Sequence, residues 1–325
     1  MITYYRLDGG HLQQQVASGL DAVPSQVLWI DLLHPSREEE HFVETALQVD
    51  IPTREEMAEI EDSSRFYEEN GVLYLTPSVV CGIGTQRPEA TDVFFIFNGK
   101  CLITVHYLDL SSLHGFPARL ARQPEKHRAC DMILASLVDC FVDRIADTLE
   151  DLQEQLDSLT QQVFAERIEA QSPEKASLQQ VVKQLGLHHL LLSKLGDSLM
   201  SLSRMMIYLR QSPKDWLGGA ARNWLKAIER DIRSLGEYQA RMSGKITFLL
   251  DATLGLINIE QNSIIKVLSI AAVLFLPPTL VGTIYGMNFK DMPELEWHMG
   301  YPMALGMMAV SAWLSYLLFK YKDWL

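Results

Sequence analysis

Apolar residues change their spacing along this chain, and the change divides it into three parts. In the first part, short apolar runs between turn residues predict strands over 26–31 and 72–80. Two further runs, 91–98 and 100–107, flank the turn-like Asn98-Gly99 and predict a β-hairpin. Residues 1–130 are therefore expected to form a mixed α+β domain.

Two helix-start signals lie between the first two strands. Ser36 is followed three residues later by Glu39, which matches a capping box. Pro52-Thr53 opens a second segment, rich in acidic residues and typical of a solvated helix face.

From about residue 131 the spacing becomes helical and stays so. A break near 171–173 separates a first long helix from a second that runs to about Arg210, and Ser212-Pro213 offers the start of a third. Residues 131–265 are thus expected to form a helical stalk whose third helix continues into the next segment. Such a stalk needs partner helices or subunits, because one helix cannot bury its own apolar stripe. The stripe of the first helix steps by three or four residues: Leu137, Phe141, Ile145, Leu149, Leu152, Leu156 and Leu159.

Two C-terminal segments are apolar and long enough to cross a membrane. Residues 267–289 contain no ionisable side chain, and 297–319 contain only His298. Each meets the length of roughly 20 apolar residues that a spanning helix needs. The expected organisation is a first span at 266–289, an extracytoplasmic loop at 290–296, a second span at 297–319 and a basic tail at 320–325.

The flanking charges predict the orientation of these spans. Lys266 precedes the first span, Lys320 and Lys322 follow the second, and the loop between them is acidic on balance. Because basic residues favour the cytoplasmic side, both chain ends are expected in the cytoplasm. The start of the chain shows no secretory-signal pattern, which agrees with this orientation. We therefore expect a two-span protein of the inner (plasma) membrane.

Composition and spacing argue against several other functions. The formal net charge of −13 does not suit a nucleic-acid partner, and no G-x-x-x-x-G-K-[ST] sequence predicts a nucleotide partner. The four cysteines are scattered, which favours buried free thiols in a reducing compartment. His188-His189 are adjacent and therefore face different directions on a helix, so they predict no zinc site. No nucleophile and base are grouped near the spans, so an enzyme is not expected.

The junction after the first span carries the most specific motif in the chain. It reads Tyr285-Gly286-Met287-Asn288-Phe289, and Met292-Pro293-Glu294-Leu295 follows in the loop. Gly-Met-Asn directly after a first transmembrane helix, with Met-Pro-Glu-Leu beyond it, resembles the CorA family of Mg²⁺ channels. The resemblance includes residues 258–262 and 275–279 and is collinear, though looser, over the rest of the chain.

This resemblance implies a funnel-shaped homopentamer with an αβα cytoplasmic domain. The first span would line the pore, and the second would form an outer ring. Family members move Mg²⁺, often with Co²⁺ or Ni²⁺, down the electrochemical gradient, and close when cytoplasmic Mg²⁺ occupies sites between subunits. The ZntB-like branch carries Zn²⁺ and usually has a variant triplet, so the intact triplet of Gly286, Met287 and Asn288 favours Mg²⁺.

The triplet and the helix before it supply the expected ion path. Gly286 would let backbone carbonyls approach the pore axis, while five copies of Asn288 would form a neutral ring of amide oxygens. A helix C-cap is the alternative explanation for Gly-x-Asn, because both residues favour the left-handed conformation. Glu294 is expected in the outer loop, and Pro277-Pro278 predicts a bend. Uncharged residues are expected to line the pore and form a dewetting gate, although Leu268 also suits helix packing or lipid: Asn262, Ile265, Leu268, Ala272, Leu276 and Thr279.

The regulatory metal ligands are less well defined by the sequence. Glu229 and Asp231 on the third stalk helix are candidates, as are Asp139, Asp143 and Asp147 on the first, and solvent-facing acids are the alternative for each. Two other functions stay open at this point. One is a transporter of Zn²⁺ or of a broad range of divalent ions with the same fold. The other is a membrane-tethered coiled-coil scaffold that conducts nothing.

Overall fold

The structure, a computed structural model, describes residues 1–8, 11–54, 61–83, 88–165, 178–212, 216–288, 292–293 and 297–322. The chain forms two compact units, Met1–Leu250 and Asp251–Leu325. The strands are β1 (Ile2–Asp8), β2 (His11–Val16), β3 (Val27–Leu33), β4 (Phe66–Glu69), β5 (Val72–Leu75), β6 (Ser78–Cys81), β7 (Glu89–Phe97) and β8 (Leu102–His106). The helices are α1 (Arg37–Leu47), α3 (Asp62–Arg65), α4 (Ser111–His114), α5 (Phe116–Arg122), the 3₁₀ helix η1 (Pro124–His127), α6 (Cys130–Ala165), α7 (Leu178–Gln211), α8 (Gly219–Tyr285) and α9 (Gly300–Tyr321).

The described strands of the first unit form a mixed sheet in the order β2-β1-β3-β8-β7-β5-β4, with β6 also paired to β7. β3 and β8 are parallel, whereas the other pairs are antiparallel. The predicted hairpin is confirmed as β7 and β8. Its turn is held by the Asn98 side chain, which accepts hydrogen bonds from the backbone N–H groups of Lys100 and Cys101, and Gly99 has a φ of +81°.

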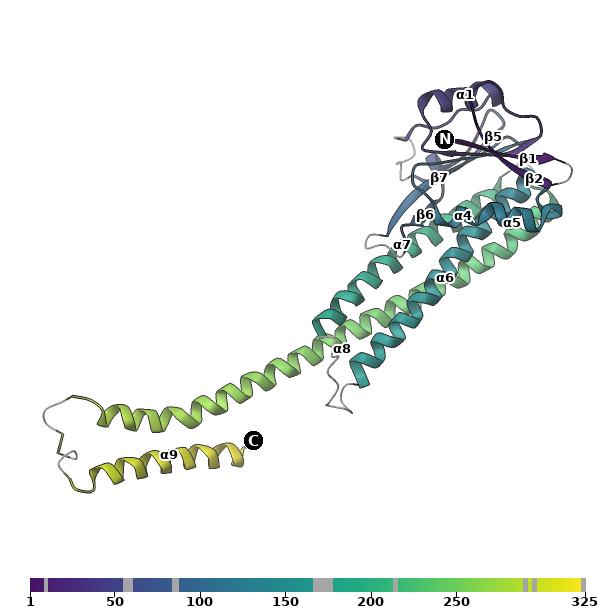
Figure 1. Ribbon diagram of the computed structural model, residues 1–325. Coiled ribbons are helices and arrows are strands. Elements are labelled where there is room, and N and C mark those ends of the chain that lie inside the picture. The colour runs from purple at the N-terminus through teal and green to yellow at the C-terminus, as the bar shows by residue number, and fades with distance from the viewer. Residues whose placement is uncertain are drawn as a thin grey trace. The chain divides into compact units, whose positions relative to one another are not determined.

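Helices cover both faces of this sheet, which gives the predicted αβα arrangement (Figure 1). α1 lies on one face, where Val43 joins a core with Ile30 and Ile96. The capping box that starts α1 is confirmed, since Ser36 and Glu39 bond reciprocally. The helix expected after Pro52 falls largely on residues 55–60, outside the described residues. Aromatic side chains of the sheet contact the long and short helices that follow it: Trp29 with Phe116, Phe66 with Tyr208, and Phe95 with Phe141. Phe97 packs on Trp216, which lies between α7 and α8.

Three long helices follow the sheet, as the helical spacing predicts. The apolar stripe of α6 is buried from Leu137 to Leu159, so its partners come at least in part from the same chain. Phe164 of α6 stacks on Phe248 of α8 at 6.2 Å between ring centroids. Gln239 of α8 donates to the Leu192 carbonyl of α7 at 3.1 Å. The break expected at 171–173 lies outside the described residues.

Two predictions from the sequence were wrong: the start of the third long helix and the single strand over 72–80. The third helix begins at Gly219 rather than at Ser212, whose N–H instead donates to the Tyr208 carbonyl at the end of α7. Between the two helices Trp216 packs on Phe97 of the sheet and Leu217 is buried, and this burial outweighs the local start signal. The strand expected over 72–80 is two strands, β5 and β6, because Pro77 has no N–H for the sheet.

The second unit contains the end of α8 and the whole of α9. Both helices are long and apolar enough to cross a membrane. α8 continues through Pro277 and Pro278. The helices meet at Gly282, where an added Cβ would lie 2.9 Å from Met308 Cε. The expected two-helix region at the C-terminal end is therefore present.

Candidate functional site

Gly286, Met287 and Asn288 follow directly after α8, which ends at Tyr285. The Gly286 N–H donates to the Gly282 carbonyl at 3.0 Å, and the Met287 N–H donates to the Ile284 carbonyl at 3.2 Å. Neither Gly286 nor Asn288 is among the described residues that adopt a positive φ, so the left-handed cap does not explain this motif. A Cβ on Gly286 would lie 3.1 Å from the Gly282 carbonyl oxygen, so a close backbone approach favours glycine here.

Met287 and Asn288 are exposed in the single chain. The amide of Asn288 carries a carbonyl oxygen with two lone pairs and no net charge. It can therefore accept hydrogen bonds from the water shell of a cation without binding the metal as tightly as a carboxylate would.

The face of α8 that precedes Asn288 in the sequence, over residues 262–279, is also exposed and uncharged. Ile265, Leu268 and Leu276 are 60%, 65% and 64% exposed, and Asn262, Ala272 and Thr279 are exposed as well. A continuous apolar surface of this length is not stable in water, so subunits or lipid must cover it. Thr279 donates its hydroxyl to the Phe275 carbonyl at 2.7 Å, which leaves the oxygen lone pairs for water.

The two prolines change the hydrogen bonding of α8 near this face. Pro277 and Pro278 lack the N–H groups that would otherwise reach the carbonyls of Val273 and Leu274. At membrane depth, backbone carbonyls without such a donor need another partner, and a water-lined cavity can provide one. This segment of α8 is therefore suited to line a hydrated path.

α9 presents an apolar surface of its own. Val310, Leu314 and Leu318 are exposed large hydrophobic residues, and Trp313 and Tyr316 are exposed aromatics. The polar groups of Ser311 and Ser315 are satisfied within the helix by the carbonyls of Met308 and Ser311. A helix that bonds its own polar groups and exposes apolar side chains is compatible with lipid.

The candidate regulatory carboxylates are spread over the first unit. Arg119 forms ion pairs with both Asp139 and Asp143. Burial raises the pKa of Asp139, and the neighbouring Asp143 adds to the rise despite Arg119. Asp147 is exposed on the same helix.

Glu229 and Asp231 have different surroundings. Glu229 accepts a hydrogen bond from Arg210 at 3.1 Å, with its side chain 19% exposed, whereas Asp231 is exposed. The two residues lie two positions apart on α8 and so face different directions. Within the described part of the chain, no group of three or more His, Cys, Asp or Glu residues could hold a metal ion. Glu294 lies outside the described residues.

Comparison with known proteins identifies the family. Residues 24–321 match the family model described as "CorA-like Mg2+ transporter protein". The chain belongs to the CorA family. The magnesium transport proteins CorA of Haemophilus ducreyi, Campylobacter jejuni strain RM1221 and Escherichia coli K12 are 32%, 31% and 30% identical to it, each over 100% of both chains. CorA proteins are membrane transporters of metal ions, not enzymes.

Solved structures confirm the fold of this CorA chain. The complete CorA magnesium transporter of Methanocaldococcus jannaschii matches with a TM-score of 0.77 at 16% identity, over 100% of this chain and 99% of that one. The full-length CmaX protein matches with a TM-score of 0.66 at 16% identity, over 99% and 98%. At these identities the likeness concerns the fold alone.

One feature of this CorA chain was missed from the sequence. Arg210, Arg222 and Lys226 line a pocket between the end of α7 and the start of α8. The acidic net charge hid this local excess of cations. The spacing of Arg222 and Lys226, four positions apart, is a signal that could have revealed it, since such residues share a helix face.

Proposed function

We propose that this chain is the subunit of a homopentameric channel that carries Mg²⁺, and with it Co²⁺ or Ni²⁺, into the cell down the electrochemical gradient. One observation carries the proposal: the exposed, uncharged face of α8 leads directly to Gly286, Met287 and Asn288. The curated relatives named as magnesium transport proteins support Mg²⁺ as the ion. The membrane potential supplies about 2.3 kcal/mol per charge per 100 mV, so roughly twice that acts on a divalent ion.

The proposed filter is a ring of five Asn288 amides, one from each subunit. Mg²⁺ gives up its water slowly, so a pore that removes the full water shell would conduct poorly. Amide oxygens that bond the water shell recognise the hydrated ion without this cost. In this proposal Gly286 allows the backbone to stay close to the end of α8, and Met287 connects Gly286 to Asn288. Glu294, in the outer loop, is proposed to attract cations to the pore.

The proposed gate lies along the same helix. Five copies of Ile265, Leu268 and Leu276 would form apolar rings that exclude water when the helices are close together. Asn262 and Thr279 would provide polar rings on either side, and Ala272 would leave space between them. Opening would then require the α8 helices to move apart far enough for the pore to fill with water.

The proposed stimulus for closure is cytoplasmic Mg²⁺ bound by carboxylates between subunits. Glu229 and Asp231 are the proposed ligands, with Asp139, Asp143 and Asp147 as the next candidates. At Glu229, Mg²⁺ would have to displace the Arg210 guanidinium. The proposed location is the inner membrane, with both chain ends in the cytoplasm, spans at 266–289 and 297–319, and the loop at 290–296 outside.

Uptake of Mg²⁺ into liposomes that contain the purified protein tests this function. We expect uptake that depends on the protein and increases with an inside-negative potential. Competition with Co²⁺, Ni²⁺ and Zn²⁺ measures the ion preference. Zn²⁺ uptake without Mg²⁺ uptake would support the alternative of a zinc transporter, and no uptake of any divalent ion would support a non-conducting scaffold.

A further inference from the structure

A pocket of about 340 Å³ lies between the C-terminal end of α1 and the turn of the β7–β8 hairpin, within the first unit. Its volume falls at the lower end of the range of small-molecule sites. The segment that leads into β3, from Val23 to Val27, completes the lining. Among the described lining residues, Lys100 is the one that carries a charge.

The apolar side of this pocket is continuous with the hydrophobic core of the first unit. Cys101 is 5% exposed and belongs to the core between α1 and the sheet. Val23, Val27 and Leu47 are half-buried and pack against the same core. An apolar ligand group that enters the pocket would therefore remove further apolar surface from water, which favours binding.

The end of α1 brings hydrogen-bond acceptors to this pocket. The backbone N–H groups of residues 48 and 49 both donate to the Glu44 carbonyl. Those of residues 50 and 51 donate to side-chain oxygens of Tyr74 and Glu44, at 3.3 and 3.2 Å. The carbonyls of residues 45–47 therefore accept none of these four N–H groups, although helix ends usually satisfy their last carbonyls in this way.

The same end of α1 also favours a positive charge. The C-terminal end of a helix carries a partial negative charge, which basic side chains in the last turn often compensate. α1 has no basic residue in its last turn, and its first turn is acidic. A ligand ammonium group could take the place of the missing basic side chain.

The hairpin turn provides donors on another side of the pocket. The backbone N–H groups of Lys100 and Cys101 both donate to Asn98 Oδ1, at 3.0 and 2.9 Å. The amide oxygen of Asn98 is thus engaged within the turn, which leaves its NH₂ group for a ligand. The Lys100 side chain is exposed, and no carboxylate among the described residues pairs with its ammonium group.

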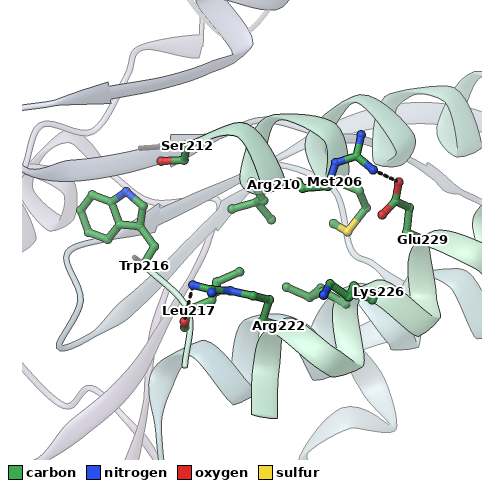
Figure 2. Close-up of a pocket in the computed structure, with 10 residues that line it drawn as sticks. Met206, Arg210, Ser212, Trp216, Leu217, Arg222, Lys226 and Glu229 are labelled. Atoms are coloured by element: carbon green, nitrogen blue, oxygen red, sulfur yellow. Dashed lines mark hydrogen bonds and ion pairs between the residues drawn. The ribbon is translucent and has the colours of Figure 1, made fainter. Parts of the chain in front are cut away.

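A pocket of about 370 Å³ between α7 and α8 differs in this respect, because its charged groups already bind one another or the backbone. Figure 2 shows Glu229 bonded to Arg210, at 3.1 Å, and Arg222 bonded to the Leu217 carbonyl, at 3.3 Å. The pocket at the end of α1 is therefore the better candidate for a ligand.

We propose that the pocket at the end of α1 binds a free α-amino acid with an apolar side chain. Lys100 and the NH₂ group of Asn98 would bind the carboxylate. The carbonyls at the end of α1 would bind the ammonium group, and Val27 and Leu47 would contact the side chain. Each charge of the ligand then meets groups of opposite charge or dipole, which replace the water that it loses. This inference goes beyond the proposed channel function and does not depend on it.

Isothermal titration calorimetry of the purified full-length protein with L-leucine tests this proposal. Two analogues each lack one charge: 4-methylpentanoate has no ammonium group, and 3-methylbutylamine has no carboxylate. We expect L-leucine to bind at least about tenfold more tightly than either analogue, because each analogue loses a charge-assisted contact. L-serine should also bind more weakly, because it lacks the apolar side chain.

A pair of variants assigns the site to this pocket. Lys100→Gln should weaken L-leucine binding about tenfold, because it removes the charge that faces the carboxylate. It should leave the melting temperature unchanged, since the side chain is exposed and the turn depends on the backbone N–H. Lys126→Gln is the matched control: Lys126 is an exposed lysine of the same unit outside the described lining. It should leave the affinity within about twofold.

Three outcomes would overturn the proposal. The first is no binding of L-leucine at concentrations up to about 1 mM. The second is wild-type affinity in Lys100→Gln. The third is equal affinity for L-leucine and for either analogue with a single charge, which would rule out joint recognition of the carboxylate and the ammonium group.

Discussion

At Asn288, one amide per subunit would decide whether a hydrated divalent ion can pass. We expect Asn288→Ala to reduce Mg²⁺ uptake at least tenfold, about the effect of losing one charge-assisted hydrogen bond in the transition state. Asn288→Asp should also reduce it, because five clustered carboxylates would hold the ion too tightly or perturb their own ionisation. Asn223→Ala, an exposed amide on the same helix outside the spans, is the control and should transport normally. Normal uptake by Asn288→Ala would refute the proposed filter.

The buried side chain of His106 leads to a second prediction, which concerns how the stability of the fold depends on pH. Its Nε2 lies 3.1 Å from Asp31 Oδ1, and its Nδ1 lies 2.8 Å from the Leu108 carbonyl oxygen. Burial lowers the pKa of His106, but the hydrogen bond and charge of Asp31 outweigh it, so the pKa is raised. The pair therefore stabilises the fold fully below the unfolded pKa of about 6.5, and this contribution is lost as the pH rises through the folded pKa.

The melting temperature of the protein should accordingly fall between about pH 6 and pH 8. His106→Gln should lower the melting temperature at pH 6 and flatten this pH dependence. His41→Gln is the matched control, because His41 is exposed on α1 and should leave the slope unchanged. An identical slope in wild type and His106→Gln would show that another group controls it.

Between the two C-terminal helices, the contact of Gly282 with Met308 predicts how closely α8 and α9 pack. A Cβ at Gly282 meets only the flexible end of Met308, so Gly282→Ala should be tolerated. Gly282→Leu should force the helices apart and lower the melting temperature in detergent, as overpacking typically costs about 1–3 kcal/mol. Gly306→Leu on α9 is the control, since no atom lies within 4 Å of its added Cβ. Equal melting temperatures for the two leucine variants would contradict a packing role for Gly282.

The elements that the sequence predicted correctly have strong local signals. The Asn98-Gly99 hairpin, the capping box of α1, the stripe of α6 and the two apolar helices each follow from short-range spacing. β2 was not predicted, because its polar run pairs at a sheet edge and buries little. β1 was not predicted either, although Ile2, Tyr4 and Tyr5 are buried. Likewise, the start of α8 depends on distant contacts, including the Gly218 N–H that donates to Asp131 at 2.8 Å.

In the candidate site, too, features with a local sequence signal were predicted, whereas contacts between distant residues were not. The triplet after α8 was found from its motif and its place after an apolar helix. The pairing of Glu229 with Arg210, 19 positions away on another helix, could not be read from local spacing. A prediction of Glu229 as a metal ligand from the sequence alone therefore could not take into account that Arg210 already pairs with it.

Labelling of cysteines in intact cells tests the membrane topology of this chain. Glu294→Cys should react with a membrane-impermeant reagent added outside, whereas a cysteine added after Leu325 should not, because the flanking lysines favour the cytoplasm. The native thiols should contribute little background: burial raises the pKa of Cys101 to about 12 and that of Cys130 to about 11, which leaves little thiolate. Labelling of the added C-terminal cysteine alone would reverse the proposed orientation.

Regulation by Mg²⁺ would be a property of the assembled channel, because the proposed sites lie between subunits. A ligand shifts an equilibrium only by its differential affinity for the two states. If Mg²⁺ binds the closed form more tightly, raising its cytoplasmic concentration should protect the first unit from protease and lower the current, while EDTA should do the reverse. A wild-type protein that shows neither effect would exclude this form of regulation.

The residues responsible can then be assigned with paired variants. Glu229→Ala with Asp231→Ala should raise the Mg²⁺ concentration needed for inhibition and leave ion selectivity unchanged, since neither residue lies in the spans. Glu237→Ala, another carboxylate on α8, serves as the control. Because removing Glu229 also releases Arg210 from its ion pair, Arg210→Gln should be measured in parallel. If Arg210→Gln shifts the inhibition as far as the double variant does, the loss of the ion pair explains the effect rather than the loss of a metal ligand. If the double variant keeps the wild-type Mg²⁺ dependence, the carboxylates of α6 become the candidates to replace next.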